Sequence, residues 1–82
     1  MPDESIKQYP LQLMQKAASS VKDHSVEQRD IQSLIFAFDK NKMKLIKKEI
    51  VSFIEHIDRT YGTEEGNADS IYAFGVQFFP LA

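Results

Sequence analysis

The sequence predicts a small all-α protein: a three-helix up-down bundle closed by a short fourth helix or by an extended aromatic C-terminal segment. Apolar residues recur at spacings of three and four through most of residues 10–61, which is typical of amphipathic helices. Hydrophobic residues make up 43% of the chain and charged residues 27%. This balance indicates a globular protein rather than a disordered one.

The 82 residues are enough for one small domain. We expect residues 1–9 to form a loose leader and residues 10–61 to form the helical core. Residues 62–69 are predicted to be an acidic loop, and residues 70–82 an aromatic C-terminal segment. Domains of this size are short of buried surface and often depend on disulfides, metals or a partner.

The first helix is expected to begin at Pro10, because a proline in the first helical turn lacks only an N–H that would be unpaired anyway. Apolar residues then recur at helical spacing as far as Val21. The sequence Lys22-Asp23-His24 interrupts this pattern, so the helix is predicted to end there.

The second helix is expected to begin at Ser25, which with Gln28 fits a capping box. Its apolar face holds Ile31, Leu34, Ile35 and Phe38. Asp39 to Asn41 is predicted to form a tight turn, since both residues tolerate turn geometry. In the alternative, no turn forms and the second and third helices continue as one long bent helix.

The third helix, Met43 to Tyr61, has the most regular pattern. Gly62 supplies a natural stop after it. Its apolar stripe is formed by Met43, Ile46, Ile50, Phe53, Ile54, Ile57 and Tyr61. The stripe is expected to face the core, and its near-heptad spacing could also support a dimer.

The C-terminal segment allows two conformations. The alternation of Tyr72, Phe74, Val76 and Phe78 favours a strand. Alternatively, Asp69 caps a short helix that ends at Pro80. The aromatic side chains could close the core, dock onto a partner, or do both from alternate faces.

Residues 39–48 hold half of the ten basic residues. Within them, Lys44, Lys47 and Lys48 fall on one flank of the apolar stripe, near the helix start. Cations are unfavourable at a helix N-terminus, which carries partial positive charge. The pattern therefore predicts an anionic surface nearby. It belongs either to a partner or to this chain, whose candidates are Glu64, Glu65 and Asp69.

The sequence gives no indication of catalysis, a cofactor or a metal site. Cysteine is absent, and the three glycines, all after position 61, form no phosphate loop. His24 and His56 are far apart in sequence and belong to no metal-binding motif. The acidic N-terminus is unlike a secretory signal, and no apolar run is long enough to span a membrane. We expect a cytoplasmic protein.

The segment Ser33–Phe38, Asn41–Leu45 and Ile50 resembles the closing hairpin of small helical-bundle bacteriocin immunity proteins. The resemblance covers residues 33–50 and implies two helices joined by a short turn. It assigns no site residues.

The expected function is that of a non-catalytic protein-binding module: a small regulator, inhibitor, immunity factor or accessory subunit that could also form a homodimer. The residues expected to contact the partner are Lys44, Lys47, Lys48, Tyr72, Phe74, Phe78 and Phe79. The alternative is a small nucleic-acid-associated regulator that uses the lysines of residues 40–48. The charge of +2 in residues 39–61 but −3 in residues 62–82 makes this less favourable, because nucleic-acid-binding domains are usually basic throughout.

Overall fold

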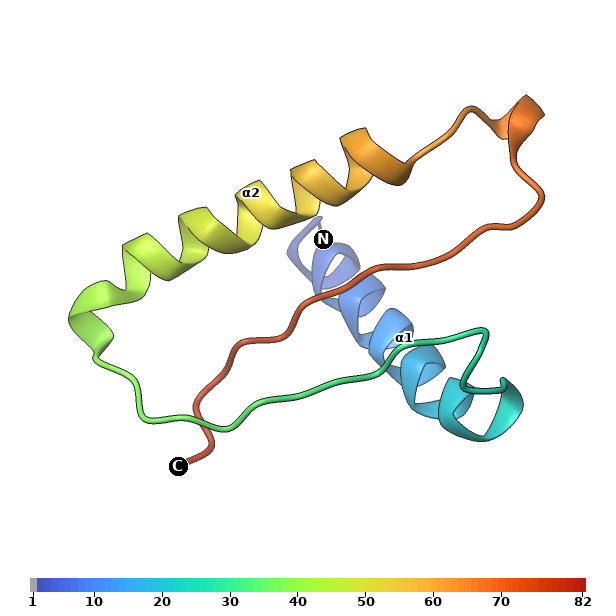
Figure 1. Ribbon diagram of the computed structural model, residues 1–82. Helices are drawn as coiled ribbons and strands as arrows, with labels where there is room; N and C mark the ends of the chain where they lie inside the picture. The colour runs from blue at the N-terminus through green and yellow to red at the C-terminus, as the bar shows by residue number, and fades with distance from the viewer. Residues whose placement is uncertain (1) are drawn as a thin grey trace. The chain divides into compact units, whose positions relative to one another are not determined.

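The computed structural model describes residues 2–82, with side chains described for residues 9–64 and 66–82. In chain order the elements are helix α1 (Pro2–Asp23), the 3-10 turn η1 (Lys40–Lys42), helix α2 (Met43–Tyr61) and the 3-10 turn η2 (Glu65–Asn67) (Figure 1). Residues 2–82 contain no strand. The all-helical class is therefore confirmed.

The predicted three-helix up-down bundle is wrong. Residues 29–39, which were expected to complete the second helix, contain no helical residue. Residues 68–82 form neither the fourth helix nor a strand. The chain divides into two compact units, Met1–Ile35 and Phe36–Ala82, called unit 1 and unit 2 below.

Helix α1 of unit 1 begins at Pro2, eight residues before the predicted start, and so includes most of the expected leader. Pro10 lies inside the helix, where it removes one backbone hydrogen bond. The helix ends at Asp23, close to the predicted end. At this end the Ser20 hydroxyl and the His24 imidazole Nδ1 are 2.8 Å apart.

The capping box predicted at Ser25 closes one turn, but no helix follows that turn. The Gln28 Oε1 accepts hydrogen bonds from the Ser25 backbone N–H at 3.2 Å and from the Ser25 hydroxyl at 3.3 Å. The Gln28 N–H donates to the Ser25 carbonyl at 3.0 Å, which closes one turn.

Arg29 turns back onto α1 instead of continuing a new helix. Its Nε donates to the His24 carbonyl at 3.2 Å and its Nη2 to the Val21 carbonyl at 3.3 Å. These carbonyls belong to the end of α1, where partial negative charge favours a cation. The residues after Arg29 are rich in β-branched and aromatic side chains, which are weak helix formers. Without a packed face, a short helix there does not recover its nucleation cost.

Helix α2 of unit 2 matches its prediction. Asp39 caps η1, with its Oδ1 accepting from the Asn41 N–H at 2.9 Å, so the predicted turn before the helix is confirmed. At the other end, the Gly62 N–H donates to the Asp58 carbonyl at 2.9 Å. Gly62 has an extended backbone, with φ −64° and ψ 144°, so it stops the helix without a left-handed conformation.

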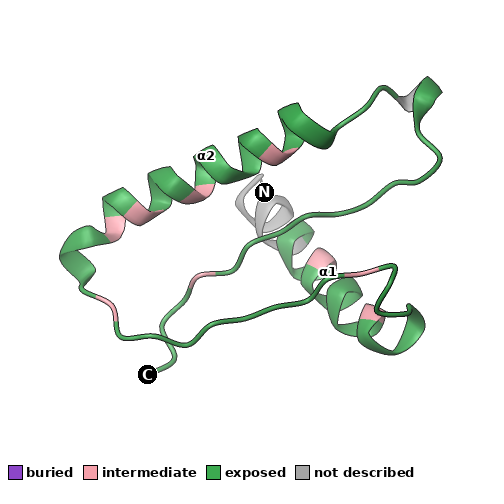
Figure 2. Cartoon of the chain, viewed as in Figure 1, coloured by how far each residue is buried: buried purple, intermediate pink, exposed green. Residues whose placement is uncertain are grey.

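The C-terminal segment runs back along α2 within unit 2 (Figure 1). It is held by aromatic contacts rather than by a regular backbone ladder. Figure 2 colours the residues by burial. Among those that it describes, every residue is half-buried or exposed. The half-buried residues of unit 2 are Phe38, Met43, Ile46, Ile50, Ile57 and Phe78. Most of them belong to the predicted apolar stripe.

Candidate protein-binding surface

Three phenylalanines form an aromatic cluster at one end of unit 2. Phe78 lies edge-on to Phe38, with ring centroids 4.9 Å apart, and stacks on Phe36 at 5.9 Å. Phe36 and Phe38 also meet each other edge-on at 6.0 Å. Both arrangements are favourable for aromatic quadrupoles. The cluster fixes the end of the chain onto the segment that leads into α2.

Phe74 anchors the same C-terminal segment further along α2. Its ring centroid lies 5.8 Å from that of Phe53, which belongs to the apolar stripe. The contact is incomplete, because Phe74 remains 51% exposed and Phe53 52%. The segment therefore touches the stripe without sealing it from water.

Tyr72 and Phe79 are the most exposed of the predicted contact residues in this segment. Their exposed fractions are 73% and 65%. Phe74 and Phe78 hold the segment in place, whereas Tyr72 and Phe79 present aromatic area to the outside. Exposure alone leaves both roles, packing and docking, as predictions for this segment.

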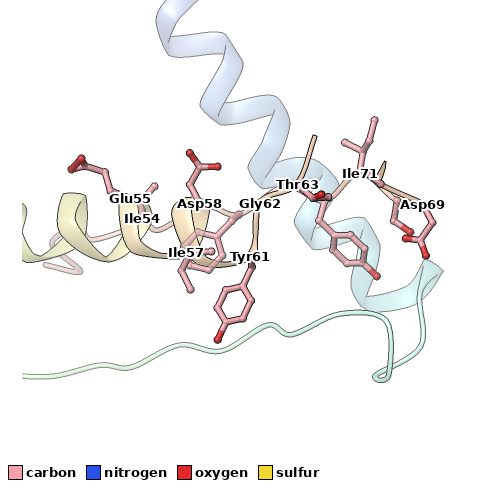
Figure 3. A pocket seen from close by; sticks show the side chains of 13 residues that line it. Ile54, Glu55, Ile57, Asp58, Tyr61, Gly62, Thr63, Asp69 and Ile71 are labelled. Carbon is pink, nitrogen blue, oxygen red and sulfur yellow. The ribbon is translucent and has the colours of Figure 1, made fainter. Parts of the chain in front are cut away.

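An open groove lies between the second half of α2 and the returning chain (Figure 3). Its volume is about 1500 Å³, larger than the range of about 300–1,000 Å³ usual for small-molecule pockets. Apolar lining comes from Ile54, Ile57, Tyr61, Ile71, Tyr72 and Phe74. Polar lining includes Glu55, Asp58 and Asp69. The groove is open and combines apolar with acidic lining.

The three predicted lysines lie in the first half of α2, as expected. Lys44, Lys47 and Lys48 are all exposed. None forms an ion pair within the part of the chain whose side chains are described. Glu64 and Asp69, two of the three acids expected to neutralise them, likewise form no ion pair there. The third, Glu65, lies outside the described side chains.

Two acids on α2 were not anticipated as site residues. Glu55 and Asp58 follow the lysines on the same flank of the helix, since residues separated by seven or eleven positions return to nearly the same face. Figure 3 shows both carboxylates on the side of α2 opposite Ile57 and Tyr61. The sequence already indicated that these acids share a flank with the lysines, because the charges lie four and seven residues on either side of Val51.

The histidines and acids of the described side chains are scattered. These side chains contain no group of three histidine, cysteine, aspartate or glutamate residues close enough to hold a metal ion. His24 and His56 each approach only a hydroxyl on their own helix turn, Ser20 and Thr60 respectively. Neither described helix has the length and hydropathy to cross a bilayer.

The loss of the second helix also removes the hairpin on which the resemblance to immunity proteins rested. No curated protein matches the chain, and no solved structure does. One family model matches residues 1–81, nearly the whole length. The chain belongs to the family described as a domain of unknown function, DUF4423.

Proposed function

We propose that the chain is a non-catalytic protein-binding module whose partner covers the exposed apolar surface of unit 2. The observation that carries this proposal is the amount of apolar side chain left in contact with water. Ile71 is 95% exposed, and Tyr72 and Phe79 lie in the same segment. Exposed apolar side chains gathered in one segment are typical of an interaction site.

The partner-facing residues in this proposal are a mixture of aromatic and charged side chains. Tyr72 and Phe79 supply aromatic anchors, and the groove beside α2 supplies a recess for an apolar side chain of the partner. Lys44, Lys47 and Lys48 form a charged edge that orients the complex. The absence of cysteine suits a reducing compartment, and we place the interaction in the cytoplasm.

The experiment is affinity capture from the native source with the wild-type chain and with the double variant Tyr72→Ser, Phe79→Ser. The variant is expected to lose the captured protein because two exposed aromatic anchors are removed. Leu45→Ser is the matched control, since Leu45 is 61% exposed on a different face of α2 and is expected to leave capture unchanged. Equal capture by all three chains contradicts the proposal.

Nucleic acid is the competing partner, and the same experiment separates it. Binding through phosphates weakens steeply with salt and shifts a duplex of arbitrary sequence in a gel. A captured complex that disappears on nuclease treatment favours nucleic acid as the partner. The double variant Lys44→Glu, Lys48→Glu then abolishes the gel shift, whereas the loss of Tyr72 and Phe79 changes it little.

A further inference from the structure

Four of the five charges on one flank of α2 are antisymmetric about Val51, and the fifth is Lys48, whose counterpart three residues after Val51 is Ile54. Lys47 precedes Val51 by four residues and Glu55 follows it by four. Lys44 precedes it by seven and Asp58 follows it by seven. Four and seven are the spacings that return to nearly the same face of an α-helix. Val51 and the four paired charges therefore line one flank, positive before Val51 and negative after it.

This flank is open to another molecule. Lys44, Lys47, Glu55 and Asp58 are exposed, and Val51 is 55% exposed. Lys47, Lys48, Val51 and Ser52 line an open hollow of about 390 Å³. None of the four charged groups forms an ion pair within the described side chains. The lysines also lie at the helix end where cations are unfavourable, so the isolated helix leaves their charge uncompensated.

A second copy of α2 carries the opposite charges at the positions that this pattern requires. When two α2 helices lie antiparallel with a two-fold axis at Val51, Lys44 of one copy faces Asp58 of the other and Lys47 faces Glu55. The axis repeats both pairs, giving four opposite-charge pairs. The helix macrodipoles also oppose each other, so each lysine-bearing N-terminus lies beside acids at a C-terminus.

We propose that unit 2 self-associates through this flank, as an antiparallel α2 pair centred on Val51. The inference goes beyond the proposed function, because it assigns a second copy of the chain to the Val51 flank, which holds neither Tyr72 nor Phe79. Val51 from each copy supplies the apolar centre over the hollow beside it, and Ile54 lies next to this centre. The charge pairs set the orientation, since a parallel pair places lysine against lysine and acid against acid.

Charge reversal tests the pairing in the full chain by sedimentation equilibrium. Lys44→Glu with Lys47→Glu makes the four paired positions acidic, and Glu55→Lys with Asp58→Lys makes them basic. Each variant alone is expected to raise the dimer dissociation constant about tenfold or more. An equimolar mixture of the two is expected to associate again, and so is the fourfold reversal, which restores the antisymmetric pattern. Lys16→Glu with Lys22→Glu in α1 is the control and leaves association unchanged.

A single introduced cysteine tests the axis, because the natural chain has none. Val51→Cys is expected to form a disulfide-linked dimer rapidly on mild oxidation, since residues on the axis meet their own copies. Leu45→Cys, on a different face of α2, is expected to remain largely monomeric. In a mixture of Lys47→Cys and Glu55→Cys chains, the mixed dimer is expected to exceed either self-linked dimer, which separates antiparallel from parallel pairing. Far-UV circular dichroism of each variant confirms that its helix content is retained.

A chain that sediments as a monomer at high concentration overturns the inference. In that case, protein capture that still depends on Tyr72 and Phe79 leaves the proposed function standing. Dimers that survive both charge reversals, or that link equally well at positions 45 and 51, also overturn the antiparallel pairing.

Discussion

Phe78 and Phe79 are consecutive in the chain, yet Phe78 packs edge-on against Phe38 while Phe79 remains 65% exposed. One residue holds the C-terminal segment in place and the other faces outward. The two adjacent positions therefore allow stability and the proposed partner binding to be tested separately.

Phe78→Ala is expected to lower the free energy of unfolding of unit 2 by about 1–3 kcal/mol, because it removes two aromatic pairs and their buried area. Urea unfolding followed by far-UV circular dichroism measures this loss. Phe79→Ala is expected to change stability by less than about 0.5 kcal/mol, as exposed substitutions usually do, and to weaken capture of the partner protein instead. Equal effects of the two substitutions on stability contradict the division of roles.

The contact between Phe53 and Phe74 predicts energetic coupling. In a double-mutant cycle of Phe53→Ala and Phe74→Ala, the coupling energy is expected to be about 0.5–1.5 kcal/mol, the range for aromatic pairs. Hydrogen exchange of the α2 amide groups provides the free energies. Phe53→Ala paired with Phe79→Ala is the control cycle and is expected to show additivity. Additive effects of Phe53 and Phe74 contradict the contact.

Gly62 is required by a close approach at the end of α2. A Cβ atom at this position lies 2.5 Å from the Asp58 carbonyl oxygen, closer than real Cβ contacts allow. Gly62→Ala is therefore expected to fray the last turn of α2 and to cost about 1 kcal/mol or more. Gly66→Ala, where a Cβ meets no atom within 4 Å, is the control. Amide exchange of residues 58–62 that is equally slow in both variants contradicts the steric reason.

Arg29 lies outside α1, yet its substitution is expected to destabilise the last turn of that helix. Arg29→Met removes both hydrogen bonds to the Val21 and His24 carbonyls, and the expected cost is about 1 kcal/mol in the stability of the last turn. Faster amide exchange in residues 20–24 measures it. Arg59→Met, whose side chain forms no hydrogen bond or ion pair among the described residues, is expected to leave α1 unchanged. Unaltered exchange in Arg29→Met contradicts the capping role.

Helix α2 could be predicted from the sequence because its signals agree. Met43, Ile50 and Ile57 repeat at helical spacing, Asp39 caps the turn before it, and Gly62 follows the last apolar residue. Local propensity and the apolar pattern specify the same nineteen residues. The lysine flank followed directly, since its position depends only on helical geometry.

The second helix was mispredicted because its local signals conflict with its surroundings. The spacing from Ile31 to Phe38 is compatible with a helix, but a short helix needs a packed apolar face to be stable. Phe36 and Phe38 instead join Phe78, a residue forty positions further along the chain. No local sequence pattern reveals a contact between residues so far apart in the chain. Nor does a local pattern reveal that Arg29 donates its hydrogen bonds to the end of α1.

The central claim is that another protein molecule covers the exposed aromatic surface of unit 2. Photo-cross-linking tests it most directly, with a photoreactive phenylalanine derivative in place of Phe79 in the cells that produce the protein. The account predicts a nuclease-resistant adduct heavier than the chain on a denaturing gel, at twice its mass if the partner is a second copy. The same group in place of Lys16 is the control and gives no such adduct. The absence of an adduct from position 79, or one that nuclease removes, contradicts the account.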